Sequence, residues 1–362
     1  MMRISVGTFC VIAGAAAVLA CEHGGPFPPT NYTPSEPFNA PPLIRLSVNP
    51  GQDLMPAWLP DGSIVYTTER LDRHDHDRCL AFMPGTGGAI TAYACRTTAS
   101  NDSVDVFAEA AATVLGGEAG QLAYVRMDSD RLPVIPTSPN VQAIVVAPLR
   151  TPNAARVVRA LPYSAPSGRT HWGITNLRWL DATHLAYIGQ DVSYPRGCSS
   201  CPPDTLRVGL EIAVLDIAPA VPVVTIVPGT DSASSLAVGA TSDTIFFTRE
   251  RDSVVYRHVF SSSATDTVHN FGSGHLVRDV AWAAGRLFVV VDGQPDIGGD
   301  IHILGPGPGV DSLVPGPSVA GFVWYQRPSP SPDGRRFLAQ GYAIAADSTV
   351  TSTLDVWLYE LP

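Results

Sequence analysis

The chain of 362 residues contains no lysine, so all 23 of its basic residues are arginine. They are outnumbered by 33 acidic residues, and the formal net charge is −10. Proteins that bind nucleic acids neutralise phosphates with clustered basic residues, and their affinity depends on that neutralisation. The charge balance therefore argues against a nucleic acid as a partner.

Sustained helical periodicity is also missing. Only the alanine-rich run at 108–112 indicates a helical turn. Instead, 32 glycines and 33 prolines separate many short runs of β-branched and aromatic residues. This punctuation predicts an all-β fold.

The common catalytic signatures are absent as well. The sequence holds no Gly-x-Ser-x-Gly, no His-Glu-x-x-His and no phosphate-binding loop. Sets of Ser, His and Asp can be assembled from a chain this rich in Ser and Asp, but no spacing supports any of them. We therefore assign no catalytic residue and no cofactor.

The N-terminal segment predicts export. Arg3 provides a short positive region, residues 4–17 form an apolar run, and the tetrapeptide Val-Leu-Ala-Cys follows at 18–21. The run is too short and too rich in Ala and Gly for a membrane span, so residues 1–20 are interpreted as a signal peptide. The tetrapeptide resembles the lipobox of bacterial lipoproteins, whose cysteine is lipidated after cleavage. An ordinary signal peptide with an incidental cysteine is the alternative.

The lipobox resemblance implies a membrane anchor at Cys21. Stable anchoring takes two or more acyl chains, which contribute about 0.8 kcal/mol per buried methylene. It also implies the outer membrane, because Glu22 stands where an aspartate favours inner-membrane retention. Residues 21–42 are dense in proline, which favours an extended spacer. We expect this tether to lift the globular part off the lipid, on the periplasmic face or the cell surface.

One phrase then recurs six times, at intervals of roughly 45–60 residues. It combines an approach often marked by Pro or Trp, a tight turn built on Asp, Gly or Ser, and a strand of β-branched and aromatic residues. The copies lie at 55–66, 117–125, 177–187, 240–247, 280–289 and 330–338. Such repeats bury a core only by stacking against their neighbours, so the repetition predicts a repeat architecture.

Further strand candidates follow each copy. Third strands are predicted at 79–83, 141–148, 210–217, 253–260, 300–304 and 354–361. Fourth strands are predicted only for the first five repeats, at 89–96, 155–161, 222–227, 266–271 and 311–314. An unmatched strand lies at 43–48. Because unpaired sheet edges are unfavourable, we predict that residues 43–362 form a six-bladed β-propeller of four-stranded blades, with the N-terminal strand completing the last blade.

The turn phrase resembles the repeat of TolB-type, WD-repeat-like propellers, which carry Pro-x-Trp-Ser-Pro-Asp-Gly before a strand. Residues 56–62, Pro-Ala-Trp-Leu-Pro-Asp-Gly, and residues 329–334, Ser-Pro-Ser-Pro-Asp-Gly, carry the resemblance, and the middle copies match in part. It implies a propeller in the periplasm or at the cell surface. For so diverse a family it implies no particular substrate.

Two cysteines fall in the predicted first blade. Cys79 lies in its third strand and Cys95 in its fourth, so the two could face each other across an antiparallel pair. An exported chain meets an oxidising compartment, where disulfides form and persist. We therefore predict a Cys79–Cys95 disulfide.

Cys198 and Cys201 form a Cys-x-x-Cys pair in the loop at 194–203. Three interpretations stay open: a local disulfide, a redox-active pair, or half of a zinc site completed by histidines. We favour the local disulfide, because no βαβ pattern of the redox type surrounds the pair.

Residues 73–77, Arg-His-Asp-His-Asp, are a weak candidate for a metal site. Alternation in an extended segment would put His74 and His76 on one face, with Asp75 and Asp77 as further donors. Two histidines cannot complete a four-ligand zinc site without donors from elsewhere. A solvated polar loop is the simpler interpretation, and we assign no metal.

Aspartates and tryptophans of the repeats have structural interpretations. Asp61 and Asp333 are expected to form turns, as are Asp75 and Asp77, since no calcium-loop spacing occurs. The tryptophans in or near the predicted innermost strands are expected to belong to the core; they are Trp58, Trp179, Trp282 and Trp324.

Two main functional classes survive. The favoured class is a membrane-anchored binding or assembly module, because no catalytic motif supports an enzyme. We expect this module to be a monomeric propeller that binds an envelope protein or a glycan through its loops or its channel. The alternative is an envelope enzyme, of lyase, hydrolase or quinoprotein type, with a site at the channel. A purely structural surface component is a third possibility. Ionisable residues with perturbed pKa values around the channel would favour the enzyme, and an apolar channel the binding module.

The cysteine interpretation predicts the redox state of the purified protein. A Cys79–Cys95 disulfide would close a loop of about 16 residues and stabilise the fold by about 3 kcal/mol in the chain-entropy model. Intact-mass analysis before and after reduction should show that neither this pair nor Cys198 and Cys201 is free. Four free thiols in the unreduced protein would contradict the prediction.

Overall fold

The computed structural model describes residues 43–47, 52–59, 61–68, 79–94, 103–113, 120–130, 141–149, 151–162, 169–171, 174–193, 206–292, 299–305, 311–314, 322–323, 326–341, 343–344 and 354–361. Most of these residues lie in strands, and one 3₁₀ turn, η1 (Pro152–Ala154), accompanies them. Within these ranges, no helix has the length and apolar character needed to cross a membrane.

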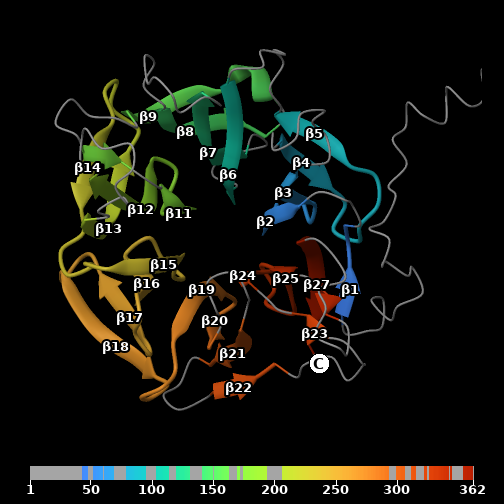
Figure 1. Cartoon of the computed structure of the whole chain (residues 1–362), viewed down its shortest axis with the longest axis vertical. Helices are drawn as coiled ribbons and strands as arrows, with labels where there is room; N and C mark the ends of the chain where they lie inside the picture. The colour runs from blue at the N-terminus through green and yellow to red at the C-terminus, as the bar shows by residue number, and fades with distance from the viewer. Residues whose placement is uncertain are drawn as a thin grey trace, which may run out of the picture.

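The strands of this part of the chain form six blades arranged in a ring (Figure 1). Blade 1 contains β2 (Asp53–Trp58), β3 (Ile64–Thr68), β4 (Cys79–Met83) and β5 (Thr91–Ala94). Blade 2 contains β6 (Ser103–Thr113), β7 (Gln121–Asp130), β8 (Val141–Pro148) and β9 (Arg156–Pro162). Blade 3 contains β11 (Thr175–Trp179), β12 (His184–Ser193), β13 (Leu206–Asp216) and β14 (Val223–Ile226).

The other three blades follow the same antiparallel order. Blade 4 contains β15 (Ala233–Val238), β16 (Thr244–Arg249), β17 (Val254–Val259) and β18 (Ala264–Asn270). Blade 5 contains β19 (Val277–Ala283), β20 (Arg286–Val291), β21 (Asp300–Leu304) and β22 (Asp311–Leu313). Blade 6 contains β24 (Gln326–Pro330), β25 (Arg336–Gly341), β27 (Asp355–Glu360) and β1 (Leu43–Arg45). The predicted six-bladed, all-β propeller is confirmed.

Three short strands were not predicted. β10 (Arg169–His171) pairs with the far end of β12, so the sheet of blade 3 has a fifth strand. β23 (Phe322–Val323) and β26 (Ala343–Ile344) form a small two-stranded ribbon. Pairs this short leave little periodicity in the sequence from which to predict them.

The predicted third strands agree closely with the structure, and those of blades 1, 2 and 5 have the predicted bounds. The helical turn expected at 108–112 is wrong, because this run lies inside β6. β6 pairs with β7 along its whole length, from Ser103 to Thr113. The helix propensity of alanine is a weak preference, and pairing with a neighbouring strand overrides it.

The turn phrase folds as predicted. The carboxylate of Asp61 accepts the N–H of Ser63 at 3.0 Å, and the carboxylate of Asp333 accepts the N–H of Arg335 at 3.1 Å. The glycine that follows each aspartate has positive φ, 81° at Gly62 and 65° at Gly334, which explains the Asp-Gly pair. The hydroxyl of Ser331 also donates to Asp333, and this bond lowers the pKa of that carboxyl group.

Apolar clusters hold the ring together, and in the described residues one cluster lies at every junction between consecutive blades. In β3, for example, Ile64 and Tyr66 pack toward blade 6, whereas Val65 packs toward blade 2. Because successive side chains point to opposite faces and both faces are covered, the central strands are buried along most of their length, as β3 is at all five positions. Each blade therefore shares its core with both neighbours.

The first strand of this part of the chain lies beside the last one (Figure 1). β1 pairs antiparallel with β27, with Leu43 opposite Tyr359 and Arg45 opposite Trp357. Leu43 is also part of the cluster between blades 5 and 6. Residues near the two ends of the chain thus contribute to one sheet.

A buried ion pair joins these two strands. The guanidinium of Arg45 lies 2.5 Å from the carboxylate of Asp355, and their side chains are 3% and 0% exposed. Arg45 also donates to the carbonyl of Ser47 at 3.1 Å, and the hydroxyl of Ser47 accepts the N–H of Val356 at 2.9 Å. These polar groups have left water, so their mutual pairing is needed to offset the cost of burial.

Every innermost strand carries an irregularity in its register with the second strand of its blade. At three of these bulges a non-glycine residue takes a left-handed conformation: φ is 54° at Met55, 54° at Asn176 and 49° at Arg327. Such a conformation costs on the order of 1–3 kcal/mol, and it persists where surrounding contacts impose it.

Hydrogen bonds between blades supply such contacts. At four junctions, a side chain of one blade accepts a backbone N–H of the innermost strand of the next blade, near its bulge. We call these four bonds the belt, and its acceptor and donor pairs are Asn176 with Leu236 (3.4 Å), Ser235 with Val280 (3.0 Å), Asp279 with Arg327 (3.3 Å) and Gln340 with Met55 (3.0 Å). The belt gives these backbone N–H groups acceptors in the neighbouring blade.

Blades 1 and 2 are joined further from the axis. The hydroxyl of Tyr93 in β5 donates to the carbonyl of Pro148 at 3.0 Å, and burial raises the pKa of this phenol. Beside it, Leu80 of β4 lies opposite Ala94 of β5. Cys95 lies outside the described residues, so the disulfide stays a prediction.

The ion pair predicts a large effect of a small substitution. Asp355→Asn removes a negative charge from its contact with the buried guanidinium of Arg45, so we expect the free energy of unfolding in urea to fall by about 3–5 kcal/mol. The double substitution Arg45→Met with Asp355→Leu removes both charges and should recover most of this loss. Asp266→Asn, which breaks the exposed pair of Asp266 with Arg257, should change stability by less than about 1 kcal/mol. Equal effects of Asp355→Asn and Asp266→Asn would contradict the prediction.

The belt is tested at Asn176. Asn176→Gly tolerates the left-handed backbone but loses the bonds to blade 4, and should cost about 1–3 kcal/mol. Asn176→Ala loses the same bonds and also meets the steric penalty of positive φ, so it should be less stable than the glycine variant by about 1 kcal/mol. Thermal and urea unfolding measure both values. A glycine variant as stable as the unsubstituted protein would show that the belt contributes nothing at this junction.

Candidate functional site

Several predicted site residues lie outside the described part of the chain, and their roles stay predictions: Cys21, His74, Asp75, His76, Asp77, Cys95, Cys198, Cys201 and Trp324. Of the predicted disulfide cysteines only Cys79 is described; it begins β4 and is fully buried. Among the described residues, no three His, Cys, Asp or Glu side chains are grouped so that they could hold a metal ion.

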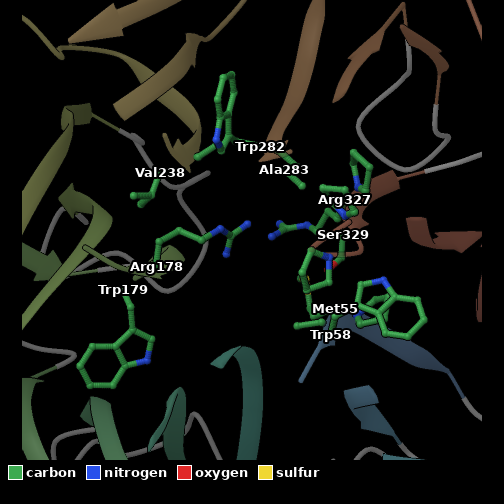
Figure 2. A pocket seen from close by; sticks show the side chains of 16 residues that line it. Met55, Trp58, Arg178, Trp179, Val238, Trp282, Ala283, Arg327 and Ser329 are labelled. Atoms are coloured by element: carbon green, nitrogen blue, oxygen red, sulfur yellow. The ribbon is translucent and has the colours of Figure 1, made fainter. Parts of the chain in front are cut away.

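A cavity of about 390 Å³ lies at the centre of the ring, where the innermost strands of five blades meet. Its lining comes from β2, β11, β15, β19 and β24, together with the turn that follows β24 (Figure 2). The lining residues are Met55, Pro56, Ala57, Trp58, Arg178, Trp179, Ala237, Val238, Ala281, Trp282, Ala283, Arg327, Pro328, Ser329, Pro330 and Pro332. We call this cavity the channel mouth.

Repetition of the blades explains why the channel mouth is open. The register of each innermost strand with the second strand of its blade shows which residues of the five strands occupy the same position of the repeat. At one such position of the lining the residues are Ala57, Arg178, Ala237, Ala281 and Ser329. Four of these five residues are small, which leaves space around the axis. Arg178 is the exception and brings a long cationic side chain into the ring of small ones.

The three described tryptophans of the lining belong mainly to the core, as predicted. Trp58 is 8% exposed and Trp179 is 9% exposed. Trp282 stacks on Phe246, with ring centroids 4.9 Å apart. Their ring faces are therefore largely occupied by neighbouring blades, although their edges contribute to the cavity wall.

Two arginines give the channel mouth its charge. Figure 2 shows the side chains of Arg178 and Arg327 pointing toward one another across the cavity. Arg178 also donates to the carbonyl of Leu177 at 2.9 Å, which helps to fix its guanidinium. Arg327 is fixed at its backbone, since its N–H is bonded to Asp279 in the belt. Both arginines are lining residues, and the described lining contains no Asp or Glu.

The sequence analysis did not identify this pair. Arg178 stands within a turn phrase and Arg327 just before one, in copies far apart along the chain. Their convergence depends on the closure of the ring and on bulges that shift each strand by a residue. Neither feature leaves a recognisable motif in the sequence. An alignment of the repeats could nevertheless have shown Arg178 as a cation at a position that is Ala or Ser in the other four strands.

No protein-family profile and no curated protein matches the chain. Solved structures match its fold. A gluconolactonase from Xanthomonas campestris aligns with 88% of this chain and 89% of its own, at 13% identity and a TM-score of 0.51. The calcium-binding protein regucalcin from Agrobacterium tumefaciens aligns with 88% of this chain and 92% of its own, at 11% identity and a TM-score of 0.50. These similarities show the propeller fold alone, and the TolB-type resemblance stays a prediction.

A second cavity, of about 500 Å³, lies at the junction of blades 3 and 4 and contains most of the ionisable groups near any described cavity. Its carboxylates have structural partners: Asp181 accepts the N–H groups of Thr183 and His184 in a turn, and Asp243 accepts the N–H and hydroxyl of Ser261. Burial lowers the pKa of His258, whose ring bonds to Thr265. These hydrogen bonds stabilise turns and paired strands, so they have a structural role. The channel mouth is therefore the stronger candidate site.

Proposed function

We propose that this chain is a lipoprotein of the bacterial cell envelope, held in the outer membrane by lipidated Cys21, whose propeller binds a protein or glycan partner at the channel mouth. Residues 21–42 would act as the spacer between lipid and propeller. The lipobox-like tetrapeptide at 18–21 and the proline-rich composition of the spacer support the anchoring.

The lining of the channel mouth is the observation that supports binding of a partner over catalysis of a reaction. An enzyme of lyase or hydrolase type needs a group that donates or accepts a proton near neutral pH. The described lining offers small and apolar side chains, a serine and two arginines, without a carboxylate, imidazole or thiol. Arginine stays protonated in proteins and cannot act as a base there. The site is therefore suited to recognition.

The fold neighbours do not favour a specific reaction. A calcium site of the kind that the name of the regucalcin relative suggests would require a set of oxygen ligands dominated by carboxylates. Among the described residues no such group is present. The enzyme alternative thus rests on the fold similarity to proteins such as the gluconolactonase.

Position-specific photo-crosslinking in intact cells tests the binding proposal. A crosslinking side chain at Ser329, in the channel mouth, should give a defined adduct, whereas the same side chain at Val221, which is 78% exposed outside the channel, should not. Cys21→Ser should release the protein from the membrane fraction without changing its unfolding midpoint. Adducts of equal yield from both positions would contradict binding at the channel mouth, and a membrane-bound Cys21→Ser variant would contradict the lipid anchor.

A further inference from the structure

We propose that the cavity of about 500 Å³ at the junction of blades 3 and 4 is a second binding site, which takes a small organic ammonium ion. We call this cavity the side cavity. The cationic group of the ligand lies between Asp243 and His258, and its apolar body lies against the aliphatic part of the wall. The proposal goes beyond the binding of a partner at the channel mouth and does not depend on it.

A histidine is buried in the wall of the side cavity. His258 is 1% exposed and lies on the same face of β17 as Tyr256 and Phe260, which pack toward blade 3. Its Nδ1 is bonded to the hydroxyl of Thr265 at 2.9 Å, and the described residues provide no hydrogen-bond partner for its Nε2. Burial lowers the pKa of this ring, so the ring is uncharged at neutral pH. When Nδ1 donates to Thr265, Nε2 is an acceptor that a ligand N–H can satisfy.

A carboxylate without a basic partner lies near this ring. Asp243, in the turn before β16, acts against the effect of burial on the pKa of His258. One oxygen of Asp243 accepts the N–H of Ser261 and the other accepts its hydroxyl, both at 2.7 Å. Each carboxylate oxygen has two lone pairs, so both oxygens can accept a further bond. No arginine or histidine of the described part of the chain is bonded to this carboxylate, which leaves it available to a cation.

The lining as a whole is negative. The ionisable groups of the described lining are Asp181, Asp216, Asp243, His184 and His258. Because His258 is uncharged, three carboxylates face at most one imidazolium. Asp181 lies 2.9 Å from Nδ1 of His184, and Asp216 lies 3.9 Å from its Nε2. These two carboxylates share an internal base, so Asp243 is the carboxylate that an external cation would contact.

The rest of the wall indicates the kind of cation. Among the described residues, no group of His, Cys, Asp and Glu side chains could hold a metal ion. The wall instead includes Leu180, Val214, Val227 and Phe260, together with the exposed Val223. Small-molecule sites typically measure about 300–1,000 Å³ and are mostly apolar, with a few polar groups that fix the orientation of the ligand. An ammonium group on an aliphatic or aromatic body matches both parts of this wall.

The experiment is isothermal titration of the detergent-solubilised full chain with 2-phenylethylamine, with titration into detergent buffer as the blank. We expect saturable binding. 2-Phenylethanol has nearly the same shape without the charge, and it should bind at least tenfold more weakly because it cannot form a charge-assisted bond to Asp243. Ammonium chloride has the charge without the apolar body, and it should show no saturable binding at the same concentrations.

Variants locate the site. Asp243→Asn should weaken binding of 2-phenylethylamine tenfold or more. Thr225→Arg introduces a cation at an exposed position of the wall and should weaken binding as strongly, without touching the turn that Asp243 forms. The matched controls Asp266→Asn and Thr267→Arg change exposed residues of β18 outside the lining, and should bind as the unsubstituted protein does. Unfolding midpoints verify that each variant is folded.

A lysine side chain of another protein carries the same chemistry as a free amine. Nα-acetyl-lysine methylamide, which mimics such a side chain, is therefore titrated in parallel. If it binds as tightly as 2-phenylethylamine, the inference is overturned in favour of a protein segment. Absence of saturable binding of 2-phenylethylamine, equal binding of 2-phenylethanol, or binding that neither Asp243→Asn nor Thr225→Arg weakens would also overturn it.

Discussion

Closure of the ring is the constraint on which the rest of this structure depends. Each blade buries both of its faces against neighbours, so one open junction would expose two apolar sheet faces and a strand edge. β1 and β27, which lie near the two ends of the chain, pair within blade 6. The buried contact of Arg45 with Asp355 lies in the blade that contains both ends. A buried ion pair adds little net stability, but the loss of one of its two charges is strongly destabilising.

Closure also shapes the channel. The innermost strands must fit around a narrow axis, and in each of them a bulge changes the direction of the strand. A bulge frees backbone N–H groups, and the belt provides acceptors for them from the preceding blade. The left-handed backbone at Arg327 is part of the same arrangement. The position of a cation in the channel mouth is thus a consequence of how the blades are joined.

Most of the fold could be predicted because its local signals are consistent. Asp61 with Gly62 and Asp333 with Gly334 mark turns that only certain backbone conformations allow, and the strands around them are rich in β-branched residues. The run at 108–112 was misassigned because alanine's local preference opposes the pairing that β7 imposes. The channel mouth could not be predicted, since a shift of one residue in a strand reverses which side chains face the axis. Arg178 and Arg327 converge only through such shifts and through contacts between blades that are distant in sequence.

The absence of lysine has a physical consequence at the channel mouth. Because the chain has no lysine, both cations of the described lining are arginines, whose planar forks stay charged at any pH relevant to the cell. A lysine in place of Arg178 would offer a point charge that accepts many geometries and is more strongly hydrated.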